Sequence, residues 1–205
     1  SGDYSTAMGD STIASGDYST AMGASTTASG FASTAMGIET AASGDHSTAM
    51  GKSTTASGYA STAMGIGSAA ANAYTMAAGR QAKANHQGAF VWADSLNADF
   101  SSTAPDQFLI RAAGGVGINK TNPATALDVT GTVTATAFSQ TSDRNLKEQF
   151  APVNSMDVLE KVAALPVSRW SFKTDSAVQH VGPMAQDFHA AFGVGTDDKH
   201  IATVD

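Results

Sequence analysis

Two residues at the start of the C-terminal third of the chain could do chemistry together. Ser142 and Lys147 stand five positions apart, in a stretch where charged residues become frequent. A serine hydroxyl is a poor nucleophile until a base takes its proton. A lysine can be that base where burial or a nearby cation lowers its pKa from the usual value of about 10.4. A serine and a lysine at this spacing also occur by chance, so the spacing alone leaves a solvated surface as the alternative.

The other residues with chemical potential form no site that the sequence reveals. The histidines lack metal-ligand spacing and are expected to be surface or structural residues: His46, His86, His180, His189 and His200. Gly114–Thr121 superficially resembles a phosphate-binding loop, but no glycine directly precedes Lys120 and no helical pattern follows. A glycine turn between strands is the better interpretation. We therefore expect no metal and no cofactor.

Composition narrows the classes of function. Charged residues make up 14% of the chain and the net charge is −7, with no cluster of lysine or arginine. Nucleic-acid binding needs such a basic patch and is not expected. No apolar run is long enough to cross a membrane, so membrane contact is expected only through parts outside this chain. The chain has no signal peptide and starts inside a repeat, which predicts a piece of a longer protein without its targeting signal.

A short repeat dominates the first half of the chain. Alanine occupies every seventh position from Ala7 to Ala84, and glycine follows two residues later almost every time. A fixed short period indicates one structural unit stacked on copies of itself. A coiled coil would need large apolar residues at two heptad positions, and frequent glycine disfavours helices. Alternate heptads differ, so the unit is 14 residues, with two short strands and two tight glycine turns.

Side chains alternate between the two faces of a strand, which assigns an inside and an outside to each repeat. The constant alanines are expected to face each other inside a narrow roll, where only a small side chain fits. This roll interior comprises Ala7, Ala14, Ala21, Ala28, Ala35, Ala42, Ala49, Ala56 and Ala63. The neighbours of each alanine then point outward, giving one face with methionines and one that is small and polar. The alternative, with methionines inside, gives no reason for the constancy of alanine.

The methionine face predicts self-association. A row of exposed methionines forms an apolar patch of the kind that marks an interface, and an alanine interior buries too little to hold one chain folded alone. Farther along, Phe90 and Trp92 take the threonine and methionine positions and are expected to plug the end of the oligomer core. The predicted interface residues are Met8, Met22, Met36, Met50, Met64, Phe90 and Trp92.

The repeats resemble the head repeats of YadA-type trimeric autotransporter adhesins over residues 1–98, with methionine in place of the usual isoleucine before glycine. The resemblance implies a left-handed parallel β-roll with three chains to a fibre. Beyond it, Phe108–Ile110, Leu127–Val129 and Thr132–Phe138 read as strands. The stretch 115–138 resembles a connector of trimeric tail fibres and adhesins, and we expect a β connector over 99–141.

The C-terminal segment, 142–205, predicts a small α+β module. Asn154 is a plausible helix N-cap before an apolar stripe that ends at Pro166. A strand is predicted over 167–173. A second helix is predicted from Pro183, ending at a Gly193 cap. The aromatic residues of this module are expected to form its core.

Three segments of this module resemble the endosialidase-type intramolecular chaperone family: Ser142–Glu148, His180–Gln186 and His200–Asp205. The resemblance implies that the module helps three chains fold in register and then cuts itself off. It also implies that Ser142 and Lys147 act as a dyad that breaks the Thr141–Ser142 bond once, after trimerisation. The chain stops before the long helical tail that the family leads us to expect.

The sequence as a whole therefore predicts a mainly β protein: a trimeric parallel β-roll, a short β connector and a small α+β module. The predicted function is that of a structural or adhesive segment of a homotrimeric surface or tail fibre, which carries its own assembly module. Self-processing by a serine peptidase dyad is the alternative, and a terminal module retained as a glycan- or receptor-binding tip is a further one. The expected partners are other copies of the chain and a surface receptor or glycan, outside the cell or on a phage tail.

Overall fold

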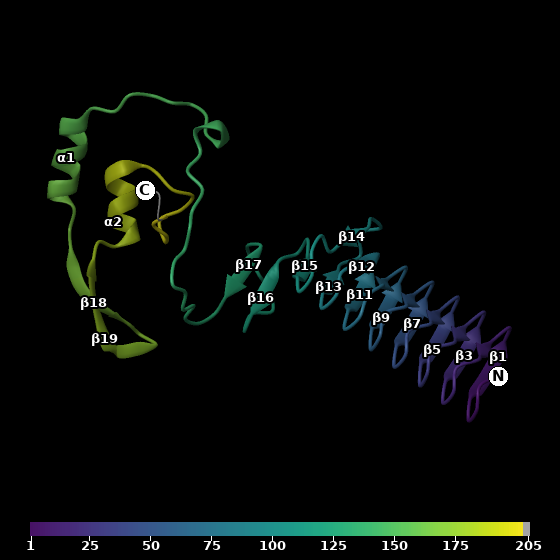
Figure 1. The fold of residues 1–205 in the computed structure, drawn as a ribbon. Coiled ribbons are helices and arrows are strands. Elements are labelled where there is room, and N and C mark those ends of the chain that lie inside the picture. The colour runs from purple at the N-terminus through teal and green to yellow at the C-terminus, as the bar shows by residue number, and fades with distance from the viewer. Residues whose placement is uncertain (203–205) are drawn as a thin grey trace. The chain divides into compact units, whose positions relative to one another are not determined.

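The computed structural model describes residues 1–202, and its fold is mainly β, as predicted (Figure 1). Contacts within the chain divide it into two compact units, with the boundary between Val133 and Thr134. The first unit is a parallel β-roll followed by a small two-stranded sheet. The second unit is a small α+β module.

Each coil of the roll contributes one longer strand to one sheet and one shorter strand to a second sheet, and every pairing is parallel. The eight-stranded sheet holds β1 (Thr6–Asp10), β3 (Thr20–Ala24), β5 (Thr34–Ile38), β7 (Thr48–Lys52), β9 (Thr62–Ile66), β11 (Met76–Arg80), β13 (Phe90–Ala93) and β15 (Phe108–Arg111). The seven-stranded sheet holds β2 (Ile13–Ala14), β4 (Thr27–Ala28), β6 (Ala41–Ala42), β8 (Thr55–Ala56), β10 (Ala69–Ala70), β12 (Ala82–Ala84) and β14 (Phe100–Ser101).

Alanine fills the space between the two sheets. Ala21 pairs with Ala35 in one sheet and Ala28 with Ala42 in the other, and all four side chains have no exposed surface. The same holds for Ala49, Ala56 and Ala63, while Ala14 is 3% exposed. Ala7 is exposed, because the first coil is covered by a neighbouring coil on one side only.

The roll was expected to end near residue 98, but its two sheets continue to Arg111. Up to Val91 each coil advances by 14 residues, whereas Val91 pairs with Leu109, which is 18 residues later. The additional residues lie between β13 and β14, in the loop from Asp94 to Asp99. Ala98, which the alanine period placed inside, lies in this loop and is exposed. The inserted residues shift the period and hide the last coil from a strict comparison.

The connector forms one short parallel sheet, in which β16 (Val116–Ile118) pairs with β17 (Leu127–Val129). Lys120 and Asp128 close the intervening turn with an ion pair of 2.8 Å. The strand expected over Thr132–Phe138 does not form. This segment is exposed throughout and no strand of the chain lies beside it, so its backbone lacks the neighbour that a β-ladder requires.

The second unit contains a 3-10 turn, η1 (Arg144–Leu146), two helices, α1 (Ser155–Ala164) and α2 (Ala185–Phe192), and a hairpin of β18 (Ser168–Phe172) and β19 (Asp175–Gly182). Both predicted caps are confirmed. The Asn154 side chain accepts a hydrogen bond from the Met156 amide at 3.0 Å, and Gly193 ends α2 in the left-handed region with φ of 64°. The long strand β19 was not predicted.

The predicted core of this module is not enclosed by the single chain. No residue between 134 and 202 is buried, and both helices lack a buried residue. Trp170 is half-buried, and Phe172 is 57% exposed. The rings do cluster, since Trp170 stacks on His180 with centroids 4.7 Å apart. The module thus gathers its apolar residues without covering them.

Candidate functional site

Ser142 and Lys147 lie in direct contact. Asp143 precedes η1, and its carboxylate accepts a hydrogen bond from the Asn145 amide at 2.9 Å. The Lys147 amide closes the turn on the Arg144 carbonyl at 3.1 Å. This tight turn reverses the chain, so that the Lys147 ammonium donates a hydrogen bond to Ser142 Oγ at 2.6 Å. A serine and an amine at this distance have the geometry of a nucleophile and its base.

The surroundings of this pair are open to solvent. Ser142, Lys147 and the residues between them are all exposed. An ammonium that donates to the serine cannot also remove its proton, so catalysis requires the neutral amine. Burial is the common means by which proteins favour a neutral amine. A single chain therefore provides the contact between the two groups, and another chain would have to provide the enclosure.

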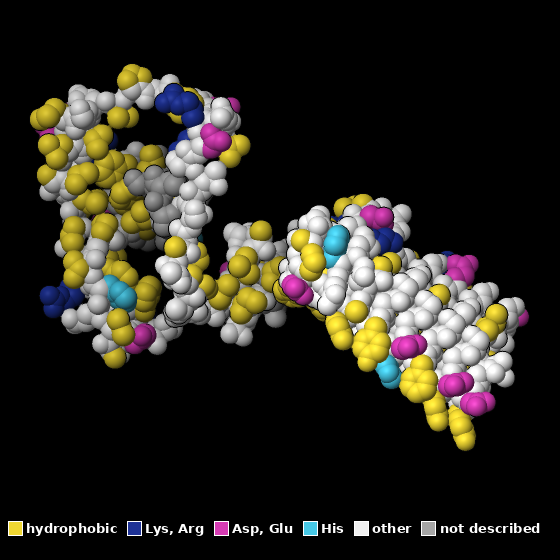
Figure 2. All heavy atoms as spheres, viewed as in Figure 1, with side chains coloured by type: hydrophobic (Ala, Val, Ile, Leu, Met, Phe, Trp, Pro, Cys, Tyr) yellow, Lys and Arg dark blue, Asp and Glu magenta, His cyan; other side chains and the backbone are white. Residues whose placement is uncertain are grey.

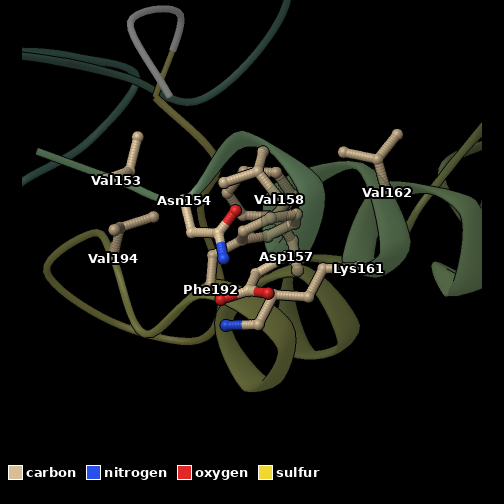
Figure 3. A pocket seen from close by; sticks show the side chains of 9 residues that line it. Val153, Asn154, Asp157, Val158, Lys161, Val162, Phe192 and Val194 are labelled. Carbon is tan, nitrogen blue, oxygen red and sulfur yellow. The ribbon is translucent and has the colours of Figure 1, made fainter.

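An open hollow of about 560 Å³ lies between α1 and α2 (Figure 3). Most of its lining is apolar, with Asn154, Asp157 and Lys161 at the rim, and the remaining lining residues are Val153, Val158, Val162, Phe188, Phe192 and Val194. The Lys161 ammonium lies 5.9 Å from the centre of the Phe192 ring. No serine, cysteine or histidine lines the hollow, so its shape and chemistry suit an apolar side chain rather than a reaction.

The methionines of the roll form a continuous row on the outer face of the eight-stranded sheet. Met8, Met22, Met36, Met50 and Met64 pair with one another in register along the strands. Met8 is 59% exposed at the open end, and the following four are half-buried by their neighbours. The row continues through Ala78 to Trp92, as the repeat predicts.

Two residues of this face were missed from the sequence. Ile110 pairs with Trp92, and Phe108 pairs with Phe90, whose ring centre lies 4.9 Å away. Both belong to β15, beyond the point where the roll was expected to end. Phe108 is exposed, as is Ile110, so the apolar face widens toward the end of the roll.

An ion pair closes that end of the roll. Arg111 contacts Asp94 at 2.9 Å, and each side chain is only about 15% exposed. The Arg111 guanidinium also donates to the Ala98 carbonyl at 2.7 Å and to the Leu96 carbonyl at 2.9 Å, which fixes the inserted loop. The hydrogen bond from the Ala113 amide, helped by the Leu96 amide and by Arg111, holds the pKa of Asp94 below its ordinary value.

The histidines occupy separate places. His86 Nδ1 lies 3.0 Å from Ser102 Oγ, His189 Nδ1 lies 2.9 Å from the Val194 carbonyl, and His200 Nδ1 lies 3.0 Å from Asp197. His46 and His180 contact aromatic rings. Within residues 1–202, no group of three or more histidine, cysteine or acidic side chains is arranged to hold a metal ion.

Two protein families match parts of the chain. Residues 1–26 and 28–54 match the YadA head domain repeat in two copies, and residues 142–194 match the chaperone of endosialidase. The chain joins YadA head repeats to an endosialidase-chaperone domain. No curated protein matches it.

The head repeats extend in the structure past the matched residues, because β9 to β15 keep the two parallel sheets of the earlier coils. The chaperone domain begins with the Ser142 and Lys147 pair and includes both helices and the hairpin. The last three residues of the segment His200–Asp205, on which part of the predicted resemblance rests, lie outside the described residues. In the part of the chain that the structure describes, no helix has the length and hydropathy needed to cross a membrane.

Proposed function

We propose that this chain is a segment of a homotrimeric fibre, on a cell surface or a phage tail, whose chaperone domain drives assembly and sets the register of the chains. The observation that carries this proposal is the absence of any buried residue between 134 and 202. A domain with exposed Val158, Leu159 and Val162 on one helix has the apolar material of a core but no cover for it. Copies of the same chain supply that cover.

The methionine face supports the same assembly in the head. The row from Met8 to Met64 is apolar, continuous and aligned with the long axis of the sheet, and it widens at Trp92, Ile110 and Phe108. In a trimer this face packs against its copies, and Phe90 and Trp92 close the end of the shared core. The small polar face of the other sheet then remains in solvent.

The need for a chaperone domain follows from the repeat itself. Coils 14 residues apart present nearly identical side chains, so two chains can pair one coil out of step at little cost. Parallel pairing of distant segments is also slow, because loop closure precedes the contacts that stabilise it. A non-repetitive domain that trimerises first sets the register and raises the local concentration of the remaining strands.

The test is the mass of the full chain in solution by light scattering, in wild type and in Met36→Lys/Met50→Lys. We expect a trimer for wild type, and monomer or aggregate for the variant, because two ammonium groups per chain would be buried in the interface. Thr55→Lys, on the outer face of the other sheet, is the matched control and should remain a trimer. A monomeric wild type at micromolar concentration would refute the proposal.

Self-processing is a second candidate, favoured by the 2.6 Å contact between Lys147 and Ser142. In this reaction the neutral amine of Lys147 takes the proton of Ser142 Oγ, which attacks the Thr141 carbonyl carbon. The C–N bond breaks, the freed Ser142 amine receives the proton, and water then hydrolyses the resulting ester. Trimer assembly would provide the enclosure that the single chain lacks.

A further inference from the structure

Exposed aromatic rings form a continuous row along one edge of the roll, with one ring from each of six successive coils. Consecutive ring centres are 5.2 to 5.7 Å apart. The five phenyl and phenol rings are between 44% and 82% exposed. Figure 2 shows the row as hydrophobic side chains that protrude from the roll, with a histidine and acidic side chains among them. We call this row the aromatic edge: Tyr4, Tyr18, Phe31, His46, Tyr59 and Tyr74.

The rings are placed against the preference of the backbone. Tyr4, Tyr18, His46 and Tyr74 occupy the left-handed region, with φ between 55° and 61°. Bulky side chains are uncommon there, and the strain costs free energy. The turn itself does not require a ring, because Ala32 and Ala60 hold the same conformation in other coils.

The opposite edge of the roll makes the same comparison. Its turns also have one residue with positive φ in each coil, and in three of them this residue is serine: Ser11, Ser25 and Ser53. Rings are thus present at one edge alone among the described coils, in a conformation that smaller residues adopt more readily. Contacts between neighbouring rings offset part of the strain. Exposed groups held in strained positions are a sign of function.

The charge at the aromatic edge restricts the partner. The turns of the six coils contain Asp3, Asp17 and Asp45, all exposed, and no lysine or arginine. Two of these carboxylates also brace the turns, since Asp17 accepts from the Asp3 amide at 2.8 Å and Asp45 from the Phe31 amide at 2.9 Å. An anionic polymer would be repelled, and a nucleic acid would lack the basic groove that accompanies stacking platforms.

A peptide partner also fits poorly, because peptides add to an open strand edge or lie in a groove. The aromatic edge is a ridge of turns, and its backbone amides are already bonded from coil to coil. The Tyr18 amide donates to Asp3 at 2.8 Å, and the Tyr74 amide donates to Tyr59 at 2.9 Å. What the ridge offers is a repeated apolar ring face beside phenol hydroxyls and carboxylates, which accept or donate hydrogen bonds.

We propose that the aromatic edge binds an extended, uncharged polysaccharide. The C–H faces of successive sugar rings would lie on the aromatic rings, and the sugar hydroxyls would bond to the tyrosine hydroxyls and aspartates. One ring per coil suits a ligand that is itself a repeat. The proposal does not depend on trimer formation, because all six rings belong to the roll of one chain.

The test is the retardation of the full chain in native gels that contain a soluble β-glucan, a mannan or a dextran. The variant Tyr18→Ala/Phe31→Ala/Tyr59→Ala removes three adjoining or alternate rings and leaves alanine, which these turns already accommodate. We expect wild type to be retarded by at least one of the three polymers and the variant to lose affinity by about tenfold or more. Ile38→Ala/Ile66→Ala removes two equally exposed apolar residues from the opposite edge and should bind as wild type does.

Alginate, an anionic polysaccharide, and polylysine are included to separate the alternatives. The proposal is overturned if none of the uncharged polymers retards the wild type, if the triple variant binds as well as wild type, or if polylysine alone binds. Hydroxyl-radical footprinting of wild type gives an answer that does not depend on folding of the variant. The polymer that binds should protect Tyr18 and Tyr59 but leave Ile38 and Ile66 unprotected, and the reverse pattern would also overturn the proposal.

Discussion

The ammonium of Lys147 donates a hydrogen bond to the hydroxyl of Ser142 at 2.6 Å, across a turn that Asp143 caps. The contact joins residues of one short segment, so it does not depend on how the rest of the chaperone domain packs. Its chemistry does depend on packing, because the serine gains a base only when the amine is neutral. Assembly of the fibre and activation of the pair can therefore be one event.

The first prediction concerns cleavage after residue 141. In trimeric wild type we expect the intact mass to be replaced by two fragments, whereas Ser142→Ala should stay whole. Lys147→Arg should also stay whole, because it keeps the positive charge but loses the base. Glu148→Ala, next to the pair, is the control and should be cut. Mass spectrometry decides the matter, and identical intact masses for wild type and Ser142→Ala would exclude cleavage.

The second prediction concerns the pH dependence of the closed end of the roll. The pKa of Asp94 is lowered in the fold, first by the Ala113 amide and then by Leu96 and Arg111. Its contribution to stability is therefore complete above the ordinary aspartate pKa of about 3.9 and is lost as the pH falls through the lower folded value. Asp94→Asn should be less stable than wild type at pH 7, and the difference should shrink below about pH 4.

Thermal unfolding at both pH values measures this difference. Asp99→Asn in the same loop is the control, because Asp99 is largely exposed and only 3.6 Å from Lys83. It should leave the melting temperature nearly unchanged at either pH. A deficit of Asp94→Asn that stays constant from pH 7 to pH 3 would contradict the role assigned to the carboxylate.

The third prediction concerns the alanine interior. Ala35 has no exposed surface, and Val at this position would overfill the space between the sheets and destabilise the fold by about 1–3 kcal/mol. Ala41→Val is the matched control, because Ala41 lies on the outer face and threonine, of similar shape, pairs with it on both sides. Guanidinium unfolding should separate the two variants. Equal stabilities would mean that the interior has room to spare.

The fourth prediction concerns the glycine that follows each methionine. Gly37 has φ of 122°, and a β-carbon there would collide with the carbonyl of Gly51 in the next coil. Gly37→Ala should therefore destabilise the roll by at least about 2 kcal/mol. Gly114→Ala meets no atom within 4 Å and should change stability by less than about 0.5 kcal/mol. Unfolding curves that coincide for the two variants would refute the steric argument.

The roll could be predicted because two periods act on the same residues. The repeat of 14 assigns the coils, and the alternation of side chains along each strand assigns Ala21 to the inside and Met22 to the outside. The last coil escaped because the loop from Asp94 to Asp99 changes the spacing and Leu109 replaces alanine inside. The aromatic edge escaped because its rings shift between two turn positions, as Tyr18 and Phe31 do, and so miss the heptad.

The candidate site was predictable to a lesser degree. The resemblance to a chaperone family indicated Ser142 and Lys147, and the Asp143 cap explains how the turn brings them together. The core of the module was not predictable, because a sequence shows which residues are apolar but not which chain covers them. Trp170 and Phe172 were expected inside, yet a single chain leaves them partly or largely in solvent.

The uniform pairing of the coils has a consequence for reach. Neighbouring strands lie about 4.8 Å apart, so each additional coil lengthens the roll by that amount. Met36 meets Met22 on one side and Met50 on the other in the same register, so removal of one whole coil would join surfaces that already match. The distance between the two ends of the roll can therefore change in whole steps of one coil, while the chemistry of every remaining coil stays the same.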